Sequence, residues 1–392
     1  IGKLMHYFIA KNFLASMNIT GRITNVISVA GISLGSFALI ISISVLNGFE
    51  NKLDEKISNF DGHLRIPSSV SNDKLSKIKS LKEVKSASFN YERKGMINYL
   101  SNQSLVTFKL VSPDYFESFY EIPYVGALPS KNEILLGNDI ASRLGIRTGD
   151  IVKISSPLDK RFILGFPLTI EVKVSGIFSS KILDYDNKYI FISKTIGETL
   201  FSNVIENQFI DIKLNHSSKI DETKKALSNI IGGKVISSWR DRNIALVGAI
   251  QMEKIGSVIV LSLILLVASF SILSTIYLMT IRKIKDFGIL RFLGMKMDDV
   301  HRLIMYQALI IGFRGVCIGF ISGISVVLFQ NIFKIISLPN DIYAMEVLPM
   351  YLYAEDIIII LFINIFFILI TGFYGARKFL KYDPMEMLKW VK

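Results

Sequence analysis

The sequence predicts an integral membrane protein with four transmembrane α-helices and a large extracytoplasmic α+β domain between helices 1 and 2. Of its 392 residues, 51% are hydrophobic and the mean hydropathy is +0.43. A bilayer core of about 30 Å needs roughly 20 apolar residues in a helix, and four runs are that long. The expected spans are residues 26–49, 255–281, 303–333 and 357–376.

The short segments between spans predict the orientation. Residues 1–25, 282–302 and 377–392 each carry more basic than acidic residues, whereas residues 334–356 carry more acidic ones. Basic loops stay on the cytoplasmic side. Both termini are therefore expected in the cytoplasm, with residues 50–254 and 334–356 outside. The first span is too long for a cleaved signal peptide and is expected to remain as an anchor.

The loop at 282–302 predicts a short amphipathic helix. It holds six basic and three acidic residues, and apolar residues recur at every third position. Such spacing is typical of a helical stripe, which Gly294 would end. The helix either binds a partner protein or is a plain interfacial helix on the membrane surface. The apolar positions are Ile284, Phe287, Leu290 and Leu293.

The outer segment shows strand and helix patterns at both ends, so its first and last parts are expected to pack together. Between them, residues of about 113–200 are rich in strand patterns and are expected to form an insertion. Within the insertion, "SSPLDKRFILGFPLT" (155–169) places apolar residues where a hairpin tip should be polar. This segment either folds back on the domain or forms an exposed arm that grips a partner.

The sequence shows no pattern of residues that predicts a catalytic site. No G-x-x-x-x-G-K-[ST] motif occurs, so the chain is not expected to hydrolyse nucleotides itself. "GISLG" (31–35) matches a nucleophile elbow, but it lies inside a span, where small residues four apart favour helix packing. The four histidines lack metal-binding spacing, and no catalytic residue or metal site is predicted. The predicted packing residues are Gly31, Gly35, Gly315, Gly319 and Gly323.

Two further features bear on function. Nucleic-acid binding is not expected, because the basic residues form no groove with stacking aromatic residues.

Arg314 is the only charge in the third span. It faces a bundle interior or a cavity if it lies near mid-membrane, and it is interfacial if the helix begins later.

Several segments together resemble one transporter family. A basic N-terminus, one span, a large outer domain and three more spans resemble the FtsX/MacB-like permeases of ABC transporters. "ISVAGISLGSFALIISISVLNGFE" (27–50) and "GNDIASRLGIRTGDIVKI" (137–154) are similar to motifs of its lipoprotein-releasing LolC/LolE (LolF-like) branch. "LDYDNKYIFIS" (183–193) and "IYAMEVLPMYLYAEDI" (342–357) also follow that pattern. The resemblance covers nearly the whole chain and implies a MacB-like periplasmic domain.

The resemblance implies a multi-pass protein of the bacterial inner membrane that extracts lipoproteins destined for the outer membrane. The implied partners are a LolD-type ATPase dimer, which binds ATP and Mg²⁺, and a second LolC/LolE-type subunit. The other partners are triacylated lipoproteins, a LolA-type periplasmic carrier and the bilayer, and this chain would bind no cofactor. The alternatives are an FtsX-like permease that transmits force to a cell-wall hydrolase, and a non-transport receptor or scaffold.

The same resemblance implies three groups of site residues. The loop 282–302 would be a coupling helix that docks on the ATPase, the end of the first span would bind lipoprotein, and residues 156–168 would form a carrier-binding hook. Because Gly165-x-Pro167 resembles part of that hook, the exposed arm becomes the favoured interpretation. The coupling residues are Ile284, Lys285, Asp286, Phe287, Leu290, Arg291, Leu293 and Gly294. The lipoprotein-binding residues are Ser42, Val45, Leu46, Asn47 and Phe49. The hook residues are Leu158, Arg161, Phe162, Ile163, Leu164, Gly165, Phe166 and Pro167.

Overall fold

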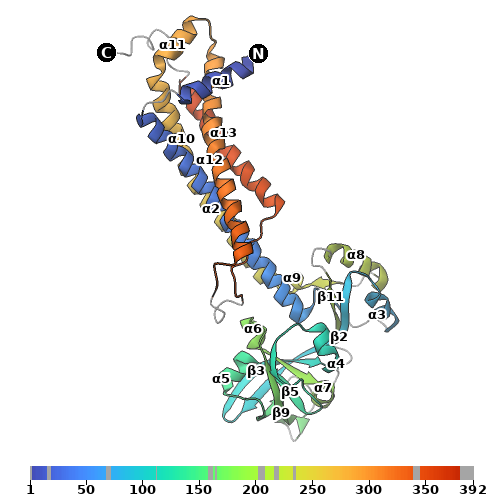
Figure 1. Ribbon diagram of the computed structural model, residues 1–392. Helices are drawn as coiled ribbons and strands as arrows, with labels where there is room; N and C mark the ends of the chain where they lie inside the picture. The colour runs from blue at the N-terminus through green and yellow to red at the C-terminus, as the bar shows by residue number, and fades with distance from the viewer. Residues whose placement is uncertain are drawn as a thin grey trace. The chain divides into compact units, whose positions relative to one another are not determined.

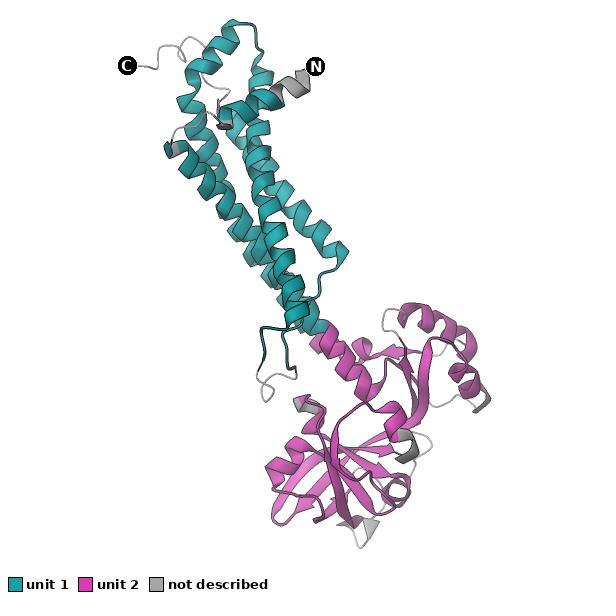
Figure 2. Cartoon of the chain, in the orientation of Figure 1, with its two compact units in different colours: residues 1–50, 249–338, 346–392 teal, residues 51–248, 339–345 magenta. Residues whose placement is uncertain are grey.

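A computed structural model gives the architecture of the chain. It divides into two compact units, residues 1–50, 249–338 and 346–392, and residues 51–248 and 339–345 (Figure 2). The structure describes residues 2–15, 19–67, 72–111, 113–157, 162–163, 166–201, 208–215, 220–232, 235–338 and 345–379.

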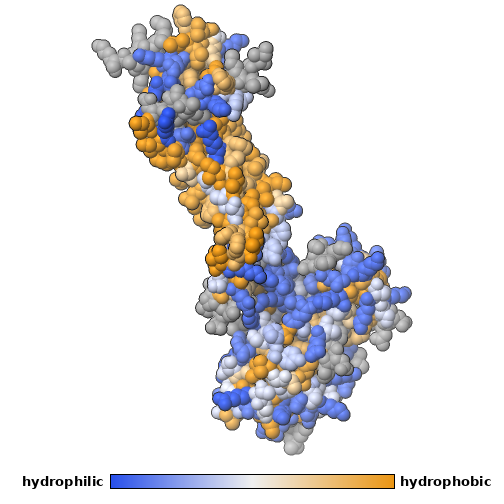
Figure 3. Space-filling model, in the orientation of Figure 1, coloured by the Kyte–Doolittle hydropathy of each residue, from blue (hydrophilic) through white to orange (hydrophobic). Residues whose placement is uncertain are grey.

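The first unit is built on four long helices, each apolar and long enough to cross a membrane (Figure 1). Its surface is largely apolar along the helices, as Figure 3 shows. Each helix extends beyond its apolar run, because the flanking charged residues continue the helical hydrogen bonding. The four helices are α2 (Ile19–Asp61), α10 (Ile244–Arg282), α12 (Met297–Phe333) and α13 (Ala354–Phe379). The predicted fold class, with four apolar helices, is confirmed.

Small residues allow α2 to pack closely against its neighbours. A Cβ added at Gly35 would lie 2.5 Å from the side chain of Leu265 in α10, and one at Gly319 in α12 would lie 2.6 Å from the carbonyl oxygen of Ser33. Hydrogen bonds join the same helices, since the Ser28 and Thr275 hydroxyls lie 2.8 Å apart. Such short-range packing is what holds helices together where lipid removes the hydrophobic driving force.

An N-terminal helix, α1 (Gly2–Ala15), was not predicted. It packs on α12, with Ala10 fully buried in the core of the helical unit. The Phe13 ring meets the Phe287 ring edge-on, 5.4 Å between centroids. The helix lies at the same end of this unit as the loop between α10 and α12 (Figure 1).

In the outer unit, the first and last parts of the segment share one antiparallel sheet in the order β12-β1-β11-β2. The helices α3 (Asn72–Lys79) and α8 (Ile220–Ile231) contribute Ile78, Leu227 and Ile231 to the core of this half. The strands are β12 (Ser237–Ser238), β1 (Leu64–Pro67), β11 (Gln208–Leu214) and β2 (Val84–Tyr99).

The other half of the outer unit is a closed barrel. Its strands pair in the order β2-β3-β10-β5-β9-β6, and β6 pairs back to β2. Closure removes the exposed strand edges that an open sheet would leave. The added strands are β3 (Asn102–Val111), β10 (Tyr189–Ser193), β5 (Glu133–Gly137), β9 (Thr169–Phe178) and β6 (Ile151–Ser155), with β4 (Tyr124–Gly126) beside β9. Short helices join them: α4 (Pro113–Phe119), α5 (Asn138–Leu144), α6 (Leu183–Asp186) and α7 (Lys194–Leu200), with α9 (Trp239–Arg242) after β12.

The insertion begins earlier than expected. The strand β2 is continuous, and it pairs with β11 through Tyr91 and with β3 from Glu92 onward. The barrel therefore starts inside β2 rather than near residue 113. The physical reason is that one long strand supplies an edge to both halves, so no turn marks the boundary in the sequence.

His63 makes the outer unit sensitive to acid. Its ring is buried, and Nδ1 accepts a hydrogen bond from the Leu214 backbone N–H, 3.1 Å away. Burial, together with the nearby Lys213 ammonium, lowers the pKa of His63 from 6.5 to about 4. The unfolded chain therefore binds more protons than the folded one between these two pH values, so folding stability falls as the pH drops through that window.

We expect a loss of about 3 kcal/mol at most between pH 7 and pH 4 from His63 alone. Urea unfolding of the full chain in detergent, followed by Trp239 fluorescence in a Trp390→Phe background, measures it. His63→Asn keeps an acceptor for the Leu214 N–H but does not titrate, so its stability should change less over this range. Equal pH dependence in the two proteins would contradict the assignment.

Candidate functional site

The loop between α10 and α12 contains the helix α11 (Ile284–Phe292). Its end has the geometry of a Schellman motif: the Gly294 N–H donates to the Arg291 carbonyl and the Met295 N–H to the Leu290 carbonyl, both at 3.0 Å. Gly294 adopts φ +98°, a left-handed conformation that glycine takes without strain. After this turn, Asp298 and Asp299 lie in the first turn of α12, where negative charge is favourable.

The predicted apolar stripe of α11 is split between two faces. Ile284 and Phe287 are buried in the core of the helical unit, whereas Leu293 is 77% exposed. Leu290 is intermediate between them. The prediction of one continuous stripe was wrong, because a spacing of three residues drifts by about 60° per step around a helix of 3.6 residues per turn.

A different apolar surface of α11 is free within the described part of the chain. Phe292 is 88% exposed and Ile289 54% exposed, and Leu293 extends the same surface. Sequence reasoning missed Ile289 and Phe292, which the assumed period placed off the stripe. Lys285 and Asp286 lie beside this surface, and Asp286 forms an ion pair with Lys283 at 3.0 Å. Arg291 lies on the side of the buried Ile284 and Phe287, where it donates to the Met295 carbonyl at 3.4 Å.

Asn47, near the end of the apolar part of α2, joins three helices. Its Nδ2 donates to an Asp356 carboxylate oxygen of α13 at 2.6 Å and to the Tyr351 carbonyl at 3.2 Å. Its Oδ1 accepts a hydrogen bond from the Lys254 ammonium of α10 at 2.8 Å. Asn47 is 1% exposed. The role of Asn47 in binding cargo stays a prediction, although the polar atoms of its side chain already have partners inside the bundle.

Gly48, which follows Asn47 in the "NGFE" segment, allows another part of the chain to approach α2 closely. A Cβ at Gly48 would collide with the carbonyl oxygen of Pro349, in the segment that precedes α13. The Tyr351 N–H also donates to the Ser44 carbonyl at 2.9 Å. The "NGFE" and "LPMYLY" segments, far apart in the sequence, thus lie against each other, and both depend on the absence of a side chain at Gly48.

We expect Gly48→Ala to cost about 1–3 kcal/mol, the usual cost of overpacking, by pushing the Pro349 segment away. Gly256→Ala is the matched control, because a Cβ there meets nothing within 4 Å. It should be neutral or stabilise α10 by about 0.5–1 kcal/mol. Hydrogen exchange of the Tyr351 amide reports the displacement, and slow exchange in the Gly48→Ala protein would contradict it.

The other residues expected at the end of the first span differ in exposure. Phe49 is 39% exposed, Ser42 and Leu46 are intermediate, and Val45 packs against a buried cluster around Leu39 and Ile43. Phe49 is therefore the residue of this group that is most open to a ligand.

The predicted hook falls largely outside the described residues, which omit Leu158, Arg161, Leu164 and Gly165. The described backbone forms a two-stranded antiparallel ribbon that is separate from the ten-stranded sheet. In it, Phe162 pairs with Pro167 and Ile163 with Phe166.

Comparison with known families gives the assignment. The model of the MacB-like periplasmic core domain matches residues 26–230, and that of the FtsX-like permease C-terminal region matches residues 258–384. The chain belongs to this family of MacB-like and FtsX-like permeases. Its fold of four apolar helices with a periplasmic α+β domain between the first two is the one that these matches imply.

Named relatives place this permease near the LolC/LolE branch. It is 24% identical over 394 residues to the lipoprotein-releasing system transmembrane protein LolC of Neisseria meningitidis, covering 93% of each chain. It is 25% identical to LolE of Haemophilus influenzae, over 92% of this chain and 93% of that protein. An ABC transporter permease of Methanocaldococcus jannaschii is 23% identical over 94% of each chain. The resemblance found in the sequence is confirmed.

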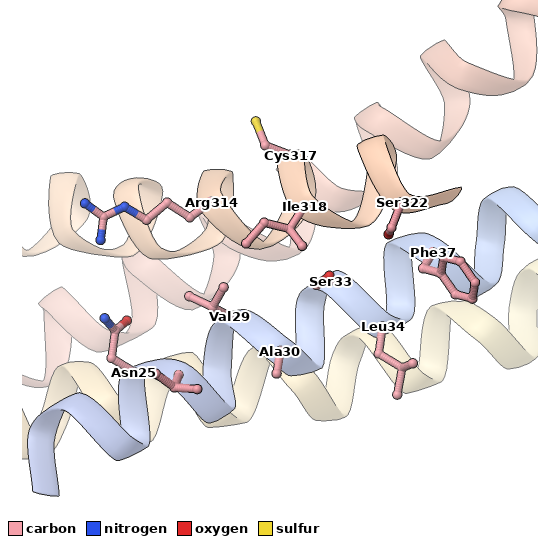
Figure 4. A pocket seen from close by; sticks show the side chains of 11 residues that line it. Asn25, Val29, Ala30, Ser33, Leu34, Phe37, Arg314, Cys317, Ile318 and Ser322 are labelled. Atoms are coloured by element: carbon pink, nitrogen blue, oxygen red, sulfur yellow. The ribbon is translucent and has the colours of Figure 1, made fainter. Parts of the chain in front are cut away.

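A groove of about 830 Å³ lies between α2 and α12 of the permease (Figure 4). Its walls are mostly apolar, and Arg314 lies at the same end as Asn25, with its side chain extended along α12 toward the N-terminus of that helix. The side chain is exposed on this groove and does not enter the bundle core. Six of the lining residues are Asn25, Ser33, Phe37, Arg314, Ile318 and Ser322.

Proposed function

We propose that the permease is the transmembrane subunit of an ATP-driven transporter that extracts outer-membrane-destined lipoproteins and transfers them to a periplasmic carrier. The observation that carries this proposal is the similarity to LolC proteins across 93% of the chain. Removal of an acyl anchor from lipid costs about 0.8 kcal/mol for each CH₂ group exposed to water, so such a transporter needs both an energy source and an apolar path.

The energy source would be a separate LolD-type ATPase dimer, because the sequence lacks a nucleotide-binding motif. In this proposal the loop that contains α11 lies in the cytoplasm, with both termini, as the basic residues of these segments predict. The exposed surface of Ile289, Phe292 and Leu293 would dock on the ATPase. An amphipathic helix in a groove of a partner is a common way to transmit motion between subunits.

The path for the anchor would begin at the outer end of α2, beside a second LolC/LolE-type subunit. Phe49 is exposed there, and the tie between Asn47, Asp356 and Lys254 would hold α2, α10 and α13 together while cargo enters. The ribbon of β7 (Phe162–Ile163) and β8 (Phe166–Pro167) would form the arm that binds a LolA-type carrier.

A photo-reactive amino acid at Phe49 tests the proposal in whole membranes. We expect cross-links to triacylated lipoproteins that disappear when ATP is supplied together with the carrier. The control position is Phe362 of α13, which is 69% exposed and lies outside the proposed path. Cross-links from Phe49 to phospholipid alone, or equal lipoprotein labelling from Phe362, would contradict the proposed cargo. Cross-links to a cell-wall hydrolase would favour the force-transmitting alternative.

A further inference from the structure

The groove between α2 and α12 is an amphipathic site with its charge at one end. Along α2 it extends from Asn25 to Phe37, which is about 18 Å at 1.5 Å per residue. One leaflet of a bilayer core is about 15 Å thick, so the groove is as long as an acyl chain in one leaflet. Arg314 supplies a guanidinium at the end where α2 and α12 begin (Figure 4).

Nothing described in the groove neutralises Arg314. No acidic residue is among those that line it. A charged side chain inside a membrane span costs about 2.5–3.5 kcal/mol or more, and such residues are usually paired or reach a headgroup. Close by, Asn25 Oδ1 is buried and has no hydrogen-bond partner among the described residues. The end of the groove therefore offers donors for an anion and one free acceptor.

We infer that this groove binds an anionic phospholipid of the bilayer, with its phosphate at Arg314 and one acyl chain along the apolar wall. A glycerol headgroup would also bring hydroxyl donors for Asn25 Oδ1. The inference does not depend on the cargo proposed above, because the acylated cysteine of a lipoprotein anchor carries no phosphate.

A second copy of the chain fits the groove less well. The other three spans, residues 26–49, 255–281 and 357–376, contain no acidic residue. A helix from another copy would therefore cover the apolar wall and leave the guanidinium unpaired in a medium of low dielectric constant.

Quenching by brominated lipids tests the site in the full chain. Ile318→Trp places a reporter in the groove, and Phe362→Trp is the control on the exposed side of α13. Both carry Trp390→Phe, and the emission of Trp239, measured in the Trp390→Phe protein without a reporter, is subtracted. The proteins are reconstituted in phosphatidylcholine with increasing amounts of brominated phosphatidylglycerol or brominated phosphatidylcholine. At the Ile318→Trp reporter we expect phosphatidylglycerol to bind at least tenfold more tightly than phosphatidylcholine. At Phe362→Trp we expect no preference.

Arg314→Gln in the reporter protein should reduce the preference to twofold or less, and Arg314→Lys should keep most of it. The inference is wrong if both lipids quench the reporter equally, or if the preference survives Arg314→Gln. It is also wrong if neither lipid quenches the reporter while Phe362→Trp is quenched, because protein would then cover the groove. Relief of quenching by an added triacylated lipopeptide at low mole fraction would instead assign the groove to the cargo.

Discussion

Lys109→Ala should destabilise the outer unit of the permease by about 3–5 kcal/mol, the cost of removing one partner of a buried ion pair. Lys109 is 0% exposed, and its ammonium lies 2.8 Å from Asp61 and 3.3 Å from Glu92. It also donates to the Phe60 carbonyl and lies over the Phe60 ring. Burial would raise the pKa of Asp61, but the Lys109 ammonium and the Arg65 guanidinium outweigh burial and hold that pKa below its ordinary value. Without Lys109, the carboxylates of Asp61 and Glu92 lose the positive charge that compensates for their burial.

Urea unfolding of the detergent-solubilised chain measures this loss. In a Trp390→Phe background, Trp239 is the remaining tryptophan and is buried in the outer unit. The matched control is Lys153→Ala, which removes an exposed pair with Glu171 and should cost less than about 1 kcal/mol. If Lys109→Ala costs less than about 1 kcal/mol, the buried ion pairs of Lys109 are not a main contribution to the stability of the outer unit.

Phe292→Asp should abolish association with the ATPase subunit and reduce ATP turnover at least tenfold, while the helical unit stays folded. The side chain is 88% exposed, so a carboxylate there breaks no internal contact and should change stability by about 0.5 kcal/mol or less. It would, however, place an unpaired charge in the centre of an apolar docking surface, which is costly to bury. Co-purification and ATPase assays in detergent measure both effects.

Phe287→Asp is the necessary comparison. Phe287 is 1% exposed and packs edge-on against Phe13. Its loss should cost about 3–5 kcal/mol even before the buried charge is counted, so this variant should lose fold and ATPase together. Retention of the ATPase by Phe292→Asp in a folded protein would refute docking through this surface. Loss of the ATPase by Phe292→Asp with a lowered thermal midpoint would show that the residue acts through folding instead.

The sequence alone determined the number of spans and the α+β nature of the outer domain. Both follow from patterns that act over short distances: runs of apolar residues that must be in helices in lipid, and alternating residues that suit a half-buried sheet. The resemblance to LolC/LolE could also be found, because the matching motifs are contiguous. The short helix in the charged loop was predicted for the same reason, and Gly294 ended it as expected from its tolerance of positive φ.

The tertiary structure decided which side chains are available to bind a ligand or a partner subunit. Asn47 was expected to face a ligand, but Asp356 and Lys254, which are more than 200 positions away, use its polar atoms. Phe287 was expected on a docking surface, but a helix at the N-terminus covers it. The closure of the barrel depends on the pairing of β2 with β6, two strands that are not neighbours in the chain. Each of these outcomes depends on contacts between distant segments, and periodicity along one segment carries no information about what covers it.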